Sequence, residues 1–287
     1  MEQETIVYPG SQLMNDYYNW HGHDMLYKYD LDHMNMMYGT DNSETIIGTD
    51  ANDMIDARAT DGGNGDFVVG GTGNDLIFLS DAGSSVIDSN VHDSDTVVTM
   101  YDYLNEQDHY GSRTEQVVLW YGDDLDIDMT GAYWSTVLKG NSGNNVITGG
   151  DVFDYISGDA GDDVLNGGGG GDMLIGGGGA DTLNGGAGDD EITGGDGDDV
   201  LSGGAGADIF EFNILEGAQA DRVTDFESGI DTIEIWDTDE NDFSMASTAT
   251  GTQISYGAGQ TIFVDGDGVE DILMSDIKFC VSDELIL

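Results

Sequence analysis

One nine-residue unit repeats eight times without interruption from Gly140 to Glu211. The copies share the form Gly-Gly-x-Gly-x-Asp-x-apolar-x. The sixth position holds a carboxylate or an amide in every copy: Asn145, Asp154, Asp163, Asp172, Asp181, Asp190, Asp199 and Asp208. The eighth position is apolar in every copy: Ile147, Ile156, Leu165, Leu174, Leu183, Ile192, Leu201 and Phe210. A strict period of this length predicts a solenoid, in which each unit is stable only against its neighbours.

The chemistry of one unit predicts how it folds. Its first six residues are rich in glycine and aspartate, which favour tight turns and cannot pack a core. Its last three residues, such as Val164-Leu165-Asn166, predict a short strand with only the middle side chain pointing inward. Two units then form one coil with turns on opposite edges. The predicted fold class is all-β, a parallel β-roll or β-helix solenoid with a C-terminal β cap.

This coil arranges the sixth-position aspartates in two columns. One edge would carry Asp154, Asp172, Asp190 and Asp208, and the other Asp163, Asp181 and Asp199. Turns on the same edge stack roughly 4.8 Å apart, the spacing of paired strands. Carboxylates at that separation repel one another unless a cation lies between them. A hard divalent ion that takes six to eight oxygen ligands suits such a column, so these aspartates predict several bound Ca²⁺ ions.

The repeat resembles the RTX (hemolysin-type) calcium-binding nonapeptide. This resemblance implies that the backbone carbonyls of unit positions 1, 3 and 5 complete the calcium shell. In one unit these are Gly158, Ala160 and Asp162, and the first positions of later units include Gly176 and Gly185. The resemblance also implies a secreted protein, exported by a type I ABC transporter and folded by calcium outside the cell.

A second, degenerate block of the same repeat precedes the first, within residues 39–98. Its sixth positions are Glu44, Asp53, Asp66, Asp75 and Asp95, and its eighth positions are Ile46, Ile55, Val68, Ile77 and Val97. The inward apolar residues are better kept than the glycines. We therefore expect a solenoid with fewer calcium sites here, the best of them at Asp53, Asp66 and Asp75.

The other segments complete a five-part organisation. Residues 99–139 resemble the connecting segment of RTX proteins and predict wider coils without a calcium ladder; their aromatic residues either stack on sugars or pack against a neighbouring coil. Residues 140–211 are the regular β-roll. Residues 212–287 resemble the family's C-terminal cap and end in Asp-Glu-Leu-Ile-Leu, which resembles a type I secretion signal. Residues 1–38, rich in aromatic residues, methionine and histidine, form either an N-terminal cap or a copper or zinc site.

Composition supports the need for calcium. The 58 acidic and 6 basic residues give a formal charge of −52, which opposes compaction and disfavours nucleic acid or an anionic membrane surface as a partner. A single cysteine excludes an internal disulfide, and no apolar run is long enough for a transmembrane segment.

No enzyme motif is present in the sequence. It has neither a His-Glu-x-x-His zinc helix nor a Gly-x-Ser-x-Gly elbow. The resulting hypothesis is a secreted, extracellular or cell-surface-associated calcium-binding protein without catalytic activity. Two alternatives stay open: an adhesion or carbohydrate-binding module with an extracellular polysaccharide or cell surface as partner, and an enzyme that acts on polysaccharide.

Overall fold

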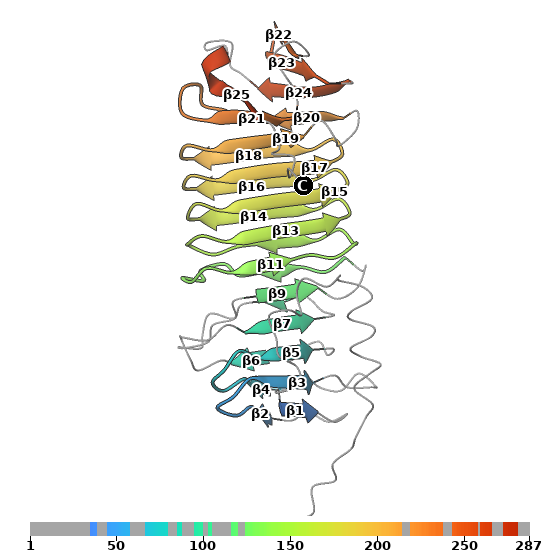
Figure 1. Cartoon of the computed structure of the whole chain (residues 1–287), viewed down its shortest axis with the longest axis vertical. Coiled ribbons are helices and arrows are strands. Elements are labelled where there is room, and N and C mark those ends of the chain that lie inside the picture. The colour runs from blue at the N-terminus through green and yellow to red at the C-terminus, as the bar shows by residue number, and fades with distance from the viewer. Residues whose placement is uncertain are drawn as a thin grey trace, which may run out of the picture. The chain divides into compact units, whose positions relative to one another are not determined.

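A computed structural model describes residues 35–38, 45–57, 67–79, 85–87, 95–99, 103–104, 116–119, 124–213, 219–237, 243–257, 259–265 and 272–280. The chain divides into two compact units, Met1–Asn35 and Met36–Leu287. Of the first unit only Asn35 is described, so the N-terminal cap or metal site predicted for residues 1–38 lies almost wholly outside the described residues. The second unit is a stack of strands (Figure 1).

Two long sheets and one short sheet make up the second unit. The twelve-stranded sheet contains, in spatial order, β1 (Asn35–Tyr38), β3 (Asp53–Ala57), β5 (Leu76–Leu79), β7 (Thr96–Thr99), β9 (Gln116–Leu119), β11 (Val137–Lys139), β13 (Tyr155–Ala160), β15 (Met173–Gly178), β17 (Glu191–Asp196), β19 (Ile209–Asn213), β21 (Thr232–Trp236) and β25 (Ile277–Cys280). The ten-stranded sheet contains β8 (Tyr103–Leu104), β10 (Ile127–Asp128), β12 (Val146–Thr148), β14 (Val164–Gly169), β16 (Thr182–Ala187), β18 (Val200–Ala205), β20 (Ala220–Val223), β24 (Gln260–Asp265), β23 (Gly251–Tyr256) and β22 (Phe243–Ser247). The three-stranded sheet contains β2 (Thr45–Ile47), β4 (Phe67–Val69) and β6 (Ser85–Ile87).

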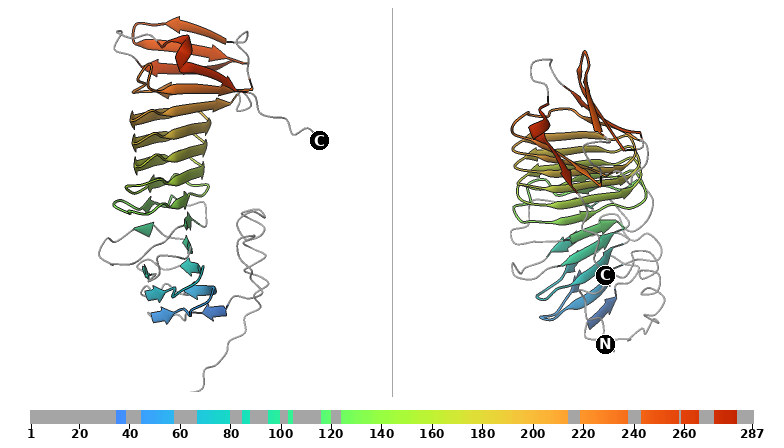
Figure 2. Two further views of the ribbon diagram at one scale, coloured as in Figure 1. Left: turned by 60° about the vertical axis from the view of Figure 1, so that its left-hand side comes forward. Right: turned by 45° about the horizontal axis from the view of Figure 1, so that its top comes forward.

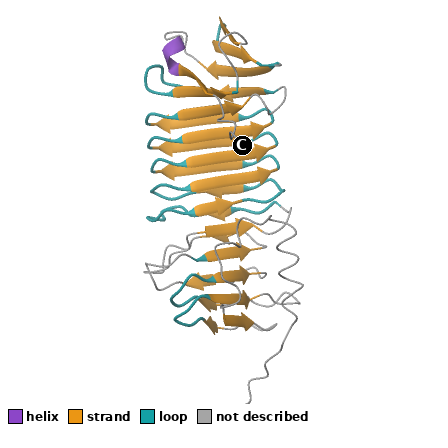
Figure 3. Ribbon diagram, in the orientation of Figure 1, coloured by secondary structure: helices purple, strands orange, loops and turns teal. Residues whose placement is uncertain are grey.

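From β7 to β21, successive strands alternate between the two long sheets, and from β1 to β6 they alternate between the twelve-stranded and the three-stranded sheet. This alternation confirms a parallel solenoid with two units per coil (Figures 1 and 3). In the regular array Leu165 pairs with Leu183, and Leu183 pairs with Leu201. The register therefore places eighth-position residues of alternate units directly above one another. All eight of these side chains are at most 1% exposed, so they form the continuous apolar column that the period predicts.

The strands of the array are longer than the three residues predicted. Strand β14 runs over Val164–Gly169, because pairing continues into the glycines of the next unit, with Gly168 opposite Gly186. Gly168 has a φ of 102°, a conformation that suits glycine, and the ladder continues past it to Gly169.

The first block differs from the regular array in its outward face. The outward side chains of Leu76, Phe78 and Val98 are each at most 2% exposed, whereas Val164 and Val200 in the array are 38% and 39% exposed. Strands β5 and β7 thus keep one inward side chain per unit, but the prediction that a unit buries only that residue is wrong for them, because they are buried on both faces. Their near-continuous apolar sequences, such as Leu-Ile-Phe-Leu, are typical of strands covered on both sides.

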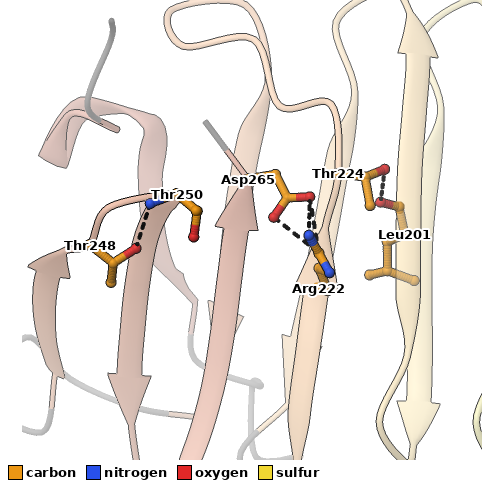
Figure 4. A network of polar contacts seen from close by, with 6 residues as sticks. All are labelled: Leu201, Arg222, Thr224, Thr248, Thr250 and Asp265. Atoms are coloured by element: carbon orange, nitrogen blue, oxygen red, sulfur yellow. Dashed lines mark hydrogen bonds and ion pairs between the residues drawn. The ribbon is translucent and has the colours of Figure 1, made fainter. Parts of the chain in front are cut away.

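The C-terminal strands end the stack. Strand β24 pairs parallel with β20, and β24, β23 and β22 then continue as an antiparallel meander (Figure 2). An ion pair of 2.7 Å joins Arg222 of β20 to Asp265 of β24, and the hydroxyl of Thr224 donates to the Leu201 carbonyl at 3.1 Å (Figure 4). The antiparallel strands therefore cover the last parallel strand edge of this sheet, which would otherwise offer a template for another chain. No helix among the described residues is long and apolar enough to cross a membrane.

Candidate calcium-binding site

The sixth-position side chains form two buried columns, one along each edge of the solenoid. Each aspartate Oδ1 accepts a hydrogen bond from the backbone N–H of the sixth residue one coil earlier. The Asp163 N–H donates to Asp181 at 2.8 Å on one edge, and the Asp172 N–H donates to Asp190 at 2.7 Å on the other. All of these side chains are 2% exposed or less. The period assigned these aspartates to two sets on opposite edges, and the structure brings the members of each set together in a column of their own.

The second carboxylate oxygen distinguishes some aspartates from others. Among the described residues of the regular array, Oδ2 is buried and has no hydrogen-bond donor in six aspartates: Asp163, Asp172, Asp181, Asp190, Asp199 and Asp208. An ionised oxygen buried without a partner is costly, because it loses water and gains no replacement. A cation ligand would remove that cost.

Glycine at the first position leaves room for oxygen atoms. A Cβ on Gly158 would collide with Asp163 Oδ2 and with the Gly176 carbonyl oxygen, and a Cβ on Gly167 would collide with Asp172 Oδ2 and the Gly185 carbonyl oxygen. A carboxylate oxygen and a first-position carbonyl oxygen therefore face the same small space in each case. Both are hard oxygen donors of the kind that calcium prefers.

Backbone atoms must supply much of any coordination shell. Among the described residues, no three acidic, histidine or cysteine side chains converge closely enough to hold an ion by themselves. The third-position carbonyl of Gly178 accepts a hydrogen bond of 2.8 Å from the Gly161 N–H, which leaves one lone pair. The carbonyls of Ala160 and Asp162 as ligands stay a prediction. The Asp162 side chain itself accepts from the Ala180 N–H at 2.9 Å at the surface.

Comparison with known families agrees with this geometry. The model of the RTX calcium-binding nonapeptide repeat matches the chain four times, over residues 38–61, 60–81, 138–174 and 175–210. These segments are RTX calcium-binding nonapeptide repeats. They bind calcium, and their number implies several ions.

Two further comparisons add no functional detail. A search of curated proteins finds no match. Among solved structures, the chain is similar to the AlgE6R3 subunit of the Azotobacter vinelandii mannuronan C5-epimerase, solved in solution, with 24% identity, a TM-score of 0.30, and coverage of 55% of this chain and 80% of that one.

The degenerate RTX block continues one column. The Asp53 N–H donates to Asp75 Oδ1, and the Asp75 N–H donates to Asp95 Oδ1, both at 2.8 Å. Asp95 is buried in the same column, although its unit, residues 90–98, is degenerate and contains no glycine. Its signal was the spacing of two residues from Asp95 to the inward Val97. Asp66 lies outside the described residues.

Three residues that the sequence reasoning missed extend the columns of the regular RTX array. Thr136 precedes Asp154 and donates to it through its N–H at 2.7 Å. Asp221 accepts from the Asp199 N–H at 3.1 Å, and Asp231 accepts from the Asp208 N–H at 3.0 Å. Each lies two residues before a buried apolar side chain, and this spacing is the sequence signal that could have found them.

The aromatic residues of the connector show packing where they are described. The Trp134 side chain is only 7% exposed, and its ring meets Tyr133 edge-on with 4.9 Å between centroids. Tyr133 itself is 68% exposed. Trp134 therefore contributes to the core of the solenoid and offers no flat face for a sugar.

Burial changes the acidity of the RTX aspartates. Desolvation, reinforced by neighbouring carboxylates, raises the pKa of Asp172 and of Asp181 to about 7, and that of Asp163 and of Asp190 to about 6. Hydrogen bonds from the backbone of the preceding coil oppose the rise and are too weak to cancel it. The calcium-free folded array thus holds protons that the unfolded chain releases.

We expect acid to fold the array partially when calcium is absent. A raised folded-state pKa means that ionising these buried carboxyls costs free energy in the folded state. This cost is absent below the ordinary pKa of 3.8 and complete above about pH 7. The stability of the calcium-free array therefore falls as the pH rises through this window. Far-UV circular dichroism in EDTA should show more β-structure at about pH 4 than at about pH 7.5. The double variant Asp172→Asn, Asp181→Asn should respond less. A β-content in EDTA that does not change with pH would contradict this expectation.

Proposed function

We propose that this protein is exported unfolded and folds outside the cell when several calcium ions enter its aspartate columns. The observation that carries the proposal is the set of six buried carboxylate oxygens without donors. The formal charge of −52 supports it, since self-repulsion keeps the calcium-free chain open. The family match supports calcium binding by the RTX repeats. Folding induced by that calcium is the step that we propose.

Each group in the site has a distinct part in this proposal. The six donor-free aspartates supply charged ligands, and first-position carbonyls such as those of Gly176 and Gly185 lie beside them. Carbonyls of the third and fifth positions, as in Ala160 and Asp162, complete the proposed shell. Bound calcium would supply the positive charge that offsets carboxylate repulsion inside the fold. The columns therefore act as a structural device, and we propose no catalytic step.

The proposed location is extracellular, with a type I ABC transporter as the export partner. Cytosolic calcium is kept at levels that only high-affinity sites bind, so weak sites fill only outside the cell. Folding there would oppose the return of the chain into the channel. A polysaccharide partner is not part of this proposal, since Trp134 is buried in the solenoid and only its neighbour Tyr133 is exposed.

Deletion of residues 283–287 should block export through a type I system. This segment, which lies outside the described residues, carries the Asp-Glu-Leu-Ile-Leu sequence. The deletion leaves every residue of the aspartate columns in place, so calcium-induced folding of the purified variant should match that of the full chain. The measurement is the amount of protein in the medium of cells that carry a type I transporter. Export at the full-length rate would contradict the signal assignment and leave calcium binding untouched.

A further inference from the structure

The ends of the two aspartate columns differ from their middles. In the middle, one carboxylate oxygen has a donor and the other has none; at the ends, both side-chain atoms are hydrogen-bonded. We propose that protein hydrogen bonds close the calcium ladder of the regular array, so that only six aspartates, three on each edge, require the cation. This inference rests on the proposed calcium-dependent folding and identifies the residues at which the calcium ladder ends.

Asp154 closes the N-terminal end of one column. Its Oδ1 accepts from the Thr136 N–H and from the Thr136 hydroxyl, both at 2.7 Å. Its Oδ2 accepts from the Gly150 N–H at 2.7 Å. With three donors, neither oxygen of this carboxylate is left without a partner, so the protein itself supplies here the contacts that a metal would supply in the middle of the column.

Asn145 closes the N-terminal end of the other column. The preceding coil presents the Leu125 carbonyl there in place of an N–H, and the Asn145 amide donates to it at 2.8 Å. The Asn145 Oδ1 accepts from the Asn141 N–H at 2.9 Å. A carboxylate at this position would face a carbonyl oxygen, whereas the neutral amide satisfies both partners without a cation.

Asp231 closes the C-terminal end of the first column. Its Oδ1 accepts from the Asp208 N–H at 3.0 Å, and its Oδ2 accepts from the Glu227 N–H at 2.8 Å. At the same end of the second column, Asp221 accepts from the Asp199 N–H at 3.1 Å and from the Gln219 amide at 3.4 Å.

One backbone conformation distinguishes closed from open positions. In three of the four closed cases, those of Asn145, Asp154 and Asp231, one donor is the backbone N–H four residues earlier, from Asn141, Gly150 or Glu227. None of these three donor residues has positive φ. At Asp221 the second donor is instead the side-chain amide of Gln219. In the open units the residue four positions before the aspartate has a φ between 82° and 117° in every case: Asp159, Gly168, Gly177, Gly186, Gly195 and Gly204. There, no N–H within the described residues reaches Oδ2. The turn conformation at the second unit position thus decides whether the carboxylate is satisfied by the chain or left for an ion.

Neighbouring aspartates of one column provide a matched test. Asp172→Asn replaces a donor-free oxygen with an amide nitrogen and keeps the oxygen that accepts from the Asp154 N–H, so it should lower the number of calcium ions bound per chain by at least one. Asp154→Asn replaces an oxygen that already has a donor, so the number bound should equal that of the wild type. Isothermal titration calorimetry of the full chain with calcium, after dialysis against EDTA, counts the ions.

The pair Asp208→Asn and Asp231→Asn repeats the test at the other end of the same column. Only a pair of variants whose two members both reach the β-content of the wild type in excess calcium is used to judge the proposal. If both variants of a pair bound fewer calcium ions per chain by the same number, the proposed closure of the columns by hydrogen bonds would be wrong. It would also be wrong if Asp172→Asn and Asp208→Asn bound as many ions as the wild type. A wild-type chain that binds calcium without gaining β-structure would overturn only the proposed folding step. The number of ions bound by the two variants of a pair could still be compared and would still test the closure.

Discussion

Removal of calcium should unfold the regular RTX array, and its return at about 10 mM should refold it. Six carboxylates of the folded array carry a buried oxygen without a donor, and the chain as a whole carries a charge of −52. An ion that binds only the folded state stabilises it by about 2.7 kcal/mol per site at a hundredfold excess over Kd. A few such sites therefore match the whole stability of a typical domain, about 5–15 kcal/mol.

Far-UV circular dichroism gives the readout for this folding transition. The spectrum should be that of coil in EDTA and that of β-structure in calcium. Magnesium is the control, because it demands a tighter octahedral shell and gives up its water reluctantly, so it should restore little structure at the same concentration. An equal β-content in EDTA and in calcium would show that the array folds without the ion.

Gly176→Ala should greatly weaken calcium binding, whereas Gly178→Ala should not. A Cβ on Gly176 would collide with Asp181 Oδ2 and the Gly194 carbonyl oxygen, the two oxygens that face a candidate ion. A Cβ on Gly178 meets no atom within 4 Å. Neither glycine has positive φ, so the two substitutions differ only in the space that the methyl group enters.

The expected size of the Gly176→Ala effect follows from overpacking. Forcing a methyl group into a filled site costs about 1–3 kcal/mol, which corresponds to a loss on the order of tenfold in the calcium affinity of the affected site. The calcium concentration at the folding midpoint rises by less than this, because several ions share the cost. Gly178→Ala should leave that midpoint unchanged or lower it slightly, because alanine reduces the freedom of the unfolded chain. Calcium titration followed by circular dichroism measures both midpoints. Equal shifts in the two variants would mean that the space beside Gly176 does not belong to the binding site.

The regular array was the most predictable part of this protein. A nine-residue period with one apolar position determines which side chain points inward, so the sequence alone places Leu165, Leu183 and Leu201 above one another, as the register shows. The same period fixes that Asp163 and Asp172 lie on opposite edges. Repetition makes such inference reliable, because every unit meets the same neighbours.

The first block was less predictable, because its units meet different surroundings. Phe78 and Val98 point outward from the strand yet are buried, which no count of residues within a unit could reveal. Asp95 keeps the hydrogen bond of the column although its unit has lost the glycines of the repeat. The glycines of the repeat are therefore not needed for this hydrogen bond between coils.

The sequence by itself determined the solenoid, its two aspartate columns and the ion that these columns favour, because all three follow from a period and a residue type. Only the tertiary structure decided which aspartates depend on that ion. Asp154 and Asp172 occupy the same position of the same repeat, but the carboxylate of Asp154 is satisfied by Thr136 and Gly150, and that of Asp172 keeps one oxygen without a donor. The difference lies in which backbone N–H groups point at the carboxylate, and this depends on turn conformation and on the adjoining coil.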